Sequence, residues 1–332
     1  MNNIAPAGSN NGVSVASIDS FHIGGEVVKL QDQPKIEMRV AGKGVTREVD
    51  MNGSYVTGQL YANHVRLSNP KHDAPVMFWH GGAMTGVTWE STPDGRPGWQ
   101  WIFLKDGYDV IVTDAVERGR ASWSPYPQIY KSGPVFRTKE ESWGMYRFGP
   151  KTGYDDDPMK RQAFEGQRFP MSGFDALGAQ LVPRWSTHDE ESLAAYTALL
   201  RKVGPVHLVA HSQGGWFALN MVLRMPELIK SVVVIEPAGA PTPAEHDLAA
   251  ASQIPHLFVW ADYIDDVPAW KNYRDGADNF MNALRAAGGT SDLLDLPAKG
   301  IKGNSHVPMM DNNNAEIADL VKDWMAKNPG RS

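Results

Sequence analysis

The chain has 332 residues, with 32 Lys and Arg against 38 Asp and Glu, and it has no Cys. The net charge of −6 excludes the basic excess of a nucleic-acid-binding protein, and 42% hydrophobic residues exclude a disordered chain. The lack of Cys excludes disulfides, thiolate metal sites and a Cys nucleophile.

The chain begins with a polar segment, residues 1–12, which we expect to be a flexible tail. This segment has neither a basic start nor an apolar run, so as written it is not a signal peptide, and a cytoplasmic protein is expected. If a signal peptide was removed ahead of Met1, a periplasmic or secreted location is expected instead. No run of about 18 apolar residues predicts a membrane span.

Two kinds of strand are predicted after the tail. Residues 21–29, 36–41 and 54–67 alternate in polarity between Gly-Gly and Asn-Gly turn signals, which predicts antiparallel strands. Later runs are short and apolar on both faces, as is typical of buried parallel strands. These runs are Val76–Trp79, Tyr108–Thr113, Val206–Ala210, Val232–Ile235, His256–Trp260 and Leu293–Leu296.

Helices are predicted between and after the parallel strands. The letters THDE at 187–190 form a capping box before an apolar helical repeat, and a second helix over 216–225 ends at Pro226. The last helix has one apolar stripe, made of Ile317, Leu320, Val321, Trp324 and Met325. This alternation predicts an α/β fold, with a mostly parallel sheet covered by helices on both faces.

Residues 120–186 form one connection that is too long for an ordinary loop. They hold 12 of the 32 aromatic residues of the chain. Either these aromatics build a small core of their own, or they form a lid that lines an apolar pocket. We therefore predict a cap at 120–186, inserted into a core made of 13–119 and 187–332.

The most specific chemical signal is the run Val206–Gly215. An apolar strand leads into the letters AHSQG at 210–214, and a helix follows at once, which is the context of a nucleophile elbow. Ala210 stands where the usual pattern has Gly, and it keeps the site small. The pattern predicts Ser212 as a nucleophile.

A serine hydroxyl is a poor nucleophile until a base removes its proton. Of the ten His, His306 is placed best, in a loop between the last predicted strand and the terminal helix. That loop should open at the carboxyl edge of the sheet, as the elbow does. His211, next to Ser212, is interpreted as structural packing, and His80 belongs to a different element.

That element is the Gly-rich turn HGGA at 80–83, directly after the strand Val76–Trp79. An ester carbonyl oxygen becomes anionic during attack and needs backbone N–H donors aimed at it. A turn at this place supplies one donor, and the residue after the nucleophile supplies the other. We expect an oxyanion hole formed by Gly82 and Gln213.

A carboxylate is needed to orient the His and to stabilise its protonated form. Glu236 follows the strand Val232–Ile235, whereas Asp262, Asp265 and Asp266 follow the next strand. Either position reaches the same sheet edge, so the residues alone leave the acid open between Glu236 and Asp265.

Taken together, the His-Gly-Gly turn, the Ser elbow and the late Asn-Ser-His resemble the α/β-hydrolase superfamily over residues 55–328. The runs HGGAMTGVTWE (80–90), TPDG (92–95) and GNSH (303–306) are similar to a small group of bacterial carboxylesterases. In that group the acid is a Glu after the sixth strand, which implies Glu236 here. Members of the group carry paired Cys where this chain has Gly82-Ala83, so a disulfide there is not expected.

These residues predict a carboxylesterase, a serine hydrolase that acts through an acyl-enzyme on small apolar or aromatic esters. A lactonase with the same triad is one alternative, and a receptor that binds a small molecule without turnover is another. No cofactor and no metal are expected, because nucleotide-binding and zinc-protease motifs are missing. The expected partner is a small ester and not nucleic acid, and no membrane span is expected. The oligomeric state is open and includes a homodimer.

Overall fold

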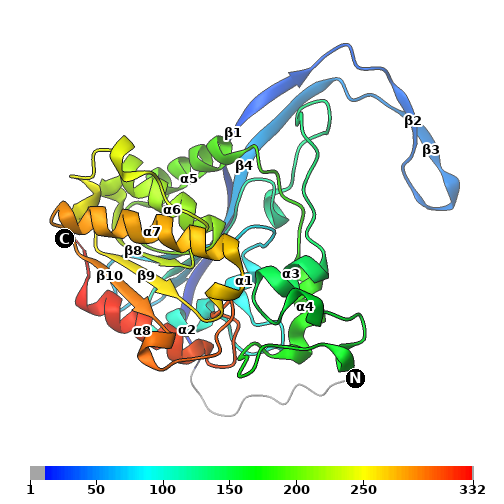
Figure 1. Ribbon diagram of the computed structural model, residues 1–332. Helices are drawn as coiled ribbons and strands as arrows, with labels where there is room; N and C mark the ends of the chain where they lie inside the picture. The colour runs from blue at the N-terminus through cyan, green and yellow to red at the C-terminus, as the bar shows by residue number, and fades with distance from the viewer. Residues whose placement is uncertain (1–11, 331–332) are drawn as a thin grey trace.

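The computed structural model describes residues 12–330, so the flexible tail expected at 1–12 lies, apart from Gly12, outside the described residues. The described strands are β1 (Val15–Leu30), β2 (Ile36–Arg39), β3 (Thr46–Val49), β4 (Gly53–Leu67), β5 (Val76–Trp79), β6 (Val110–Asp114), β7 (Val206–His211), β8 (Ile229–Ile235), β9 (His256–Trp260) and β10 (Ser291–Asp295). Eight of them form one sheet in the order β1-β4-β6-β5-β7-β8-β9-β10 (Figure 1). β1, β4 and β6 pair antiparallel, and the pairs from β6 through β5 to β10 are parallel, as predicted.

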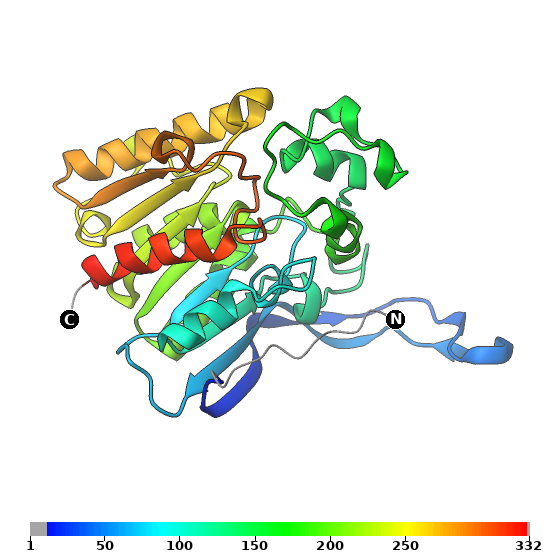
Figure 2. The same cartoon turned by 90° about the horizontal axis from the view of Figure 1, so that it is seen from below.

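Helices cover both faces of this sheet because successive strand residues point to opposite sides. The α-helices are α1 (Val87–Glu90), α2 (Trp99–Asp106), α3 (Lys139–Met145), α4 (Phe174–Gln180), α5 (Asp189–Val203), α6 (Gln213–Arg224), α7 (Pro268–Ala286) and α8 (Asn314–Lys327). One core cluster joins the sheet to α5, α6 and α7, and the other joins it to α1, α2 and α8. Figure 2 shows α7 and α8 on opposite sides of the sheet.

Two helix predictions need correction. The helix expected from Thr187 begins at Asp189, and its N-cap residue, His188, makes no side-chain cap. The capping box does not form: the Thr187 and Ser132 hydroxyls share a hydrogen bond at 3.0 Å, and Glu190 pairs with Arg224 on α6. The second correction is α7, a helix of 19 residues where none is predicted, although its buried residues repeat at helical spacing and form one apolar face.

Residues 120–186 form short helices joined by loops, as the lack of periodicity implies. Their aromatic side chains pack mainly against one another, in the two groups Trp143, Tyr146, Phe148, Phe169, Phe174 and Trp123, Tyr130, Trp185. The first group also belongs to the core cluster that joins the sheet to α1, α2 and α8, so it is not a core of the insertion alone. The division into a core and an inserted cap stays a prediction.

A long hairpin leaves the body of the molecule where β1 and β4 run past the sheet (Figures 1 and 2). The two short strands at its end, β2 and β3, pair only with each other. Among residues 12–330, no helix has the length and apolar character needed to cross a bilayer.

Candidate active site

Ser212 stands at the sharp bend between β7 and α6. Its backbone has φ +53° and ψ −118°, a conformation that costs energy for any residue other than Gly. Close packing around the bend explains the small neighbours in the sequence. A Cβ on Gly214 would lie 2.6 Å from the His80 carbonyl oxygen, and a Cβ on Gly215 would lie 3.0 Å from Pro237. The local sequence thus folds into a strained turn that presents one hydroxyl.

His306 and Glu236 meet beneath this bend. Glu236 directly follows β8 and also has a positive φ, +47°, which directs its side chain toward the loop that carries His306. The His306 Nδ1 and Glu236 Oε2 atoms are 2.5 Å apart, and both side chains are buried. Burial lowers the pKa of His306 well below its usual value, with the Arg147 guanidinium as the next largest cause.

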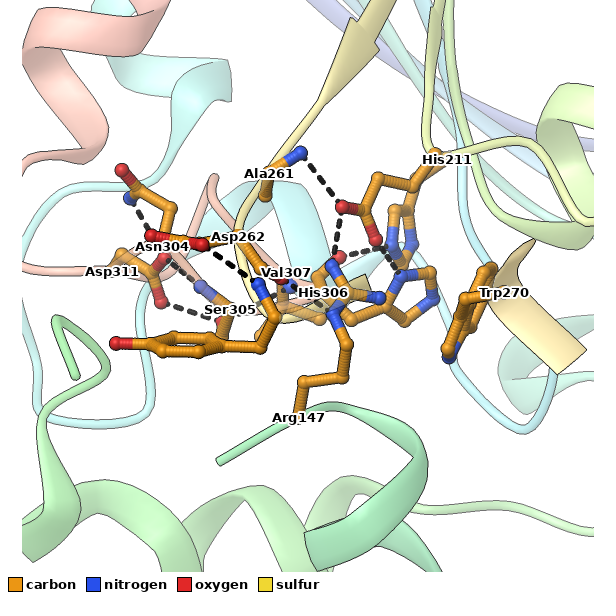
Figure 3. A network of polar contacts seen from close by, with 12 residues as sticks. Arg147, His211, Ala261, Asp262, Trp270, Asn304, Ser305, His306, Val307 and Asp311 are labelled. Atoms are coloured by element: carbon orange, nitrogen blue, oxygen red, sulfur yellow. Dashed lines mark hydrogen bonds and ion pairs between the residues drawn. The ribbon is translucent and has the colours of Figure 1, made fainter. Parts of the chain in front are cut away.

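Arg147 is the residue that sequence reasoning missed. It follows α3 in the long insertion, is completely buried, and forms an ion pair with Glu236 through Nη2 (Figure 3). Its Nε donates to the Asp262 carbonyl oxygen at 2.7 Å. Glu236 also accepts a hydrogen bond from the Ala261 N–H at 2.8 Å, so both carboxylate oxygens are engaged. The guanidinium compensates the buried negative charge, which would otherwise be costly.

Arg147→Met is expected to lower the free energy of unfolding by about 3–5 kcal/mol, because it leaves the Glu236 carboxylate buried without its cation. Urea unfolding at pH 7 measures the change. Adding Glu236→Gln to this variant should recover part of the loss, since a neutral amide needs no cation. Lys160→Met, which breaks an exposed ion pair in the same insertion, is the matched control and should change little. Equal losses in Arg147→Met and Lys160→Met would contradict this account.

The backbone of His306 is held from two sides. His211 Nε2 donates to the His306 carbonyl oxygen at 2.8 Å, and the His306 N–H donates to the Tyr146 carbonyl oxygen at 2.9 Å. The Trp270 ring lies with its centroid 3.9 Å from the imidazole. His211 is buried as packing predicts, but it also positions His306, which its place beside Ser212 did not suggest.

The loop before His306 is braced by buried polar contacts. Asp311 accepts hydrogen bonds from the Ser305 hydroxyl at 2.7 Å, the Ser305 N–H at 2.8 Å and the Asn304 amide at 2.8 Å (Figure 3). Burial raises the pKa of Asp311 to about 6, against the lowering effect of these hydrogen bonds. Asp262 accepts from the Gly303 N–H at 2.9 Å and so closes the other end of the loop.

Asp265, the alternative acid, is not near His306. Its side chain is 88% exposed and forms an ion pair with Lys271 at 2.9 Å, on the turn before α7. Of the two acids left open by the sequence, only Glu236 is in contact with His306. The residues alone could not decide this, because both carboxylates follow parallel strands at the same edge of the sheet; the resemblance to the carboxylesterase group implied Glu236.

The Gly-rich turn after β5 lies directly against the bend. A Cβ on Gly81 would be 3.0 Å from the Ser212 Cβ, so only Gly fits there. His80 shapes the turn: its Nδ1 donates to the Gly81 carbonyl oxygen at 2.8 Å and its Nε2 accepts from the Ala115 N–H at 3.0 Å. This needs a neutral ring, and burial lowers the pKa of His80 to about 4.

The two residues expected to donate N–H groups to an oxyanion, Gly82 and Gln213, lie next to each other at the bend. An added Cβ on Gly82 would lie 3.2 Å from the Gln213 side-chain oxygen, so the two residues are adjacent. Gln213 is the first residue of α6, where backbone N–H groups have no partner within the helix. Within residues 12–330, neither the Gly82 nor the Gln213 N–H donates a hydrogen bond, and both remain available to a ligand oxygen.

A cavity of about 410 Å³ opens over these groups. It is lined by Ser212, His306, Gly82 and Gln213, together with Met145, Tyr146, Trp216, Ala238, Trp270, Tyr273, Arg137, Arg184 and Asp189. The structure therefore brings four of the five expected site residues to one cavity, with Glu236 behind His306. A hydroxyl, an imidazole backed by a carboxylate, and two free N–H groups can together perform proton transfer and stabilise an anionic oxygen.

The similarities of this chain to known proteins include the following three. A model of the family described as alpha/beta hydrolase fold matches residues 74–287. A probable secreted lipase, phiG, of a fungal species (strain ATCC 74256) is 29% identical over 346 residues, which span 87% of this chain and 92% of that protein. A solved structure, described as a novel bacterial esterase, has a TM-score of 0.82 and 30% identity, covering 98% of this chain and 99% of that one. The α/β-hydrolase fold expected from the sequence is thereby confirmed.

Proposed function

The chain belongs to the alpha/beta hydrolase fold family, and on that premise we propose that it is a serine carboxylic-ester hydrolase. The observation that carries the proposal is the contact of 2.5 Å between His306 and Glu236 at a cavity that Ser212 also lines. The relatives described as a lipase and an esterase support hydrolysis of an ester bond.

In the proposed reaction, the Ser212 oxygen attacks the ester carbonyl while His306 takes the hydroxyl proton. Glu236 stabilises the imidazolium that forms, and the Gly82 and Gln213 N–H groups bind the carbonyl oxygen as it becomes anionic. His306 then gives its proton to the leaving alcohol. Water, deprotonated by His306, attacks the acyl-enzyme in the same way and releases the acid and free Ser212.

Small esters with an apolar or aromatic part are the proposed substrates. Met145, Trp216, Trp270 and Tyr273 supply apolar surface to the cavity. Hydrolysis of a panel of short aliphatic esters, aryl esters and lactones by the purified protein tests this. Sustained turnover of esters supports the proposal, faster turnover of lactones favours a lactonase, and binding without turnover favours a receptor.

The rate should depend on the protonation of His306. The imidazole must be neutral to act as a base, and burial with the nearby Arg147 lowers the pKa of His306 well below 6.5. Activity is therefore lost only as the pH falls through this lowered pKa, so kcat/KM should stay nearly constant from pH 8 down past the unperturbed His value of about 6.5. A profile of kcat/KM against pH measures the acidic limb. A limb centred above pH 6.5 would contradict the lowered pKa.

A further inference from the structure

The cavity over Ser212 is polar on one side. Of its lining residues, Arg137 and Arg184 carry positive charge and only Asp189 carries a carboxylate. Arg137 and Arg184 both come from the long insertion, and Asp189 begins α5. Two guanidinium groups in the lining are unexpected for a pocket that binds wholly apolar esters. Covering a guanidinium with an apolar group removes its hydration and costs free energy.

Arg137 has unused hydrogen-bond donors. Its side chain is 12% exposed, and its buried Nε has no hydrogen-bond partner among the described residues. Its Nη1 lies 3.0 Å from Glu141, in a geometry that does not make a hydrogen bond. Both nitrogens have almost no exposed surface, so an acceptor in the cavity would meet the remaining part of the Arg137 guanidinium, which lines it.

Arg184 lies beside the proposed oxyanion site. A Cβ on Gly82 would be 3.7 Å from Arg184 Cδ and 3.8 Å from its Nε. Within residues 12–330, no carboxylate oxygen comes within 4.0 Å of the Arg184 guanidinium. The backbone of Arg184 is fixed by two hydrogen bonds with Val135, at 2.7 and 3.0 Å, so the insertion holds Arg184 and nearby Arg137 at the same cavity.

Behind the lining residues, Arg118 adds to the positive field. It is buried, and its Nη2 donates to the Gln213 side-chain oxygen at 3.3 Å. Burial lowers the pKa of Arg118 to about 10, so it stays charged at neutral pH. Its neighbour Glu117 is also buried, which raises the pKa of Glu117 to about 8, and the Glu117 carboxyl lies 2.9 Å from His188 Nδ1. Asp189 is the only carboxylate in the lining, against the two guanidinium groups of Arg137 and Arg184.

We propose that the cavity selects esters whose acyl part carries a carboxylate, bound by the guanidinium groups of Arg184 and Arg137. This inference rests on the proposed ester hydrolysis and names its substrate class. Charge-assisted, bidentate bonds from Arg suit a carboxylate, and Arg184 places it within a few atoms of the reacting carbonyl. The apolar residues of the cavity then contact the rest of the ester.

Two esters with one leaving group test the proposal: 4-nitrophenyl hydrogen succinate, which is anionic, and its neutral methyl ester. In the wild type, kcat/KM is expected to be about tenfold higher for the anionic ester, since hydrogen bonds to charged groups are the strong ones. Arg184→Gln should lower this ratio about tenfold, and Arg184→Lys should keep part of it. Arg224→Gln, which removes the same charge from an exposed ion pair on α6, is the matched control and should keep the ratio.

The outcomes separate the two proposals. A ratio at or below one in the wild type, or a ratio unchanged in Arg184→Gln, overturns the anionic substrate but leaves ester hydrolysis standing. No turnover of either ester, with no labelling of Ser212 by a fluorophosphonate, overturns the proposed function itself. If Arg184→Gln does not fold, inhibition of the wild type decides: succinate should compete with the neutral ester and succinamide should not. Equal inhibition by both overturns the inference.

Discussion

Ser212→Ala is expected to lower kcat for ester hydrolysis by about 10⁶-fold, because the acyl-enzyme cannot form without the attacking hydroxyl. Water would have to attack the ester directly, with only binding and the oxyanion donors to assist it. The fold should survive, since Ala is smaller than Ser and the bend is held by backbone hydrogen bonds of Ser212 to Ile235 and Ala238, both at 3.0 Å.

A fluorophosphonate probe gives a second readout that does not depend on the choice of ester. It should label the wild type on Ser212 and leave Ser212→Ala unlabelled, with labelling detected by intact-protein mass spectrometry. Ser54→Ala, at an exposed position on β4, is the matched control and should be labelled as the wild type is. If the folded wild type is not labelled, or if Ser212→Ala is labelled, the assignment of Ser212 as the nucleophile is wrong.

Glu236→Gln is expected to lower kcat by about 10⁴-fold, because an amide neither stabilises the imidazolium nor accepts the Nδ1 proton in the required orientation. The contact that is lost is the 2.5 Å hydrogen bond between His306 Nδ1 and Glu236 Oε2. Asp265→Asn should leave kcat almost unchanged, since the Asp265 side chain is 88% exposed and paired with Lys271.

The comparison must separate chemistry from folding, because Glu236→Gln also leaves Arg147 buried opposite a neutral group. Circular dichroism and urea unfolding report the folded fraction, and kcat is then corrected for it. In a folded sample, the loss should fall on kcat more than on KM, since Glu236 does not line the substrate cavity. If Asp265→Asn loses far more activity than Glu236→Gln, the acid has been assigned to the wrong residue.

Much of the fold follows from short-range pattern. The apolar runs of β5, β7, β8 and β9 are buried on both faces, so they stand out in the sequence as continuous stretches. The terminal helix α8 has a regular apolar stripe and was predicted, whereas α7 was not, although its buried residues also repeat at helical spacing. Residues 187–190 match the capping-box motif, but in the fold the Thr187 hydroxyl bonds Ser132 and Glu190 pairs with Arg224 on α6.

By itself, the sequence determined the elbow around Ser212 and the loop that carries His306. Both are local features that can be recognised without knowing any tertiary contact: small residues at a strand-to-helix bend, and a His between the last strand and the last helix. For the acid, the residues alone left Glu236 and Asp265 open and a resemblance implied Glu236. The tertiary structure shows that Glu236, and not Asp265, contacts His306, and that Arg147 from the distant insertion pairs with this carboxylate. The physical reason is that a buried charge is stabilised by an opposite charge close to it in space. The spacing of residues along the chain does not identify that partner.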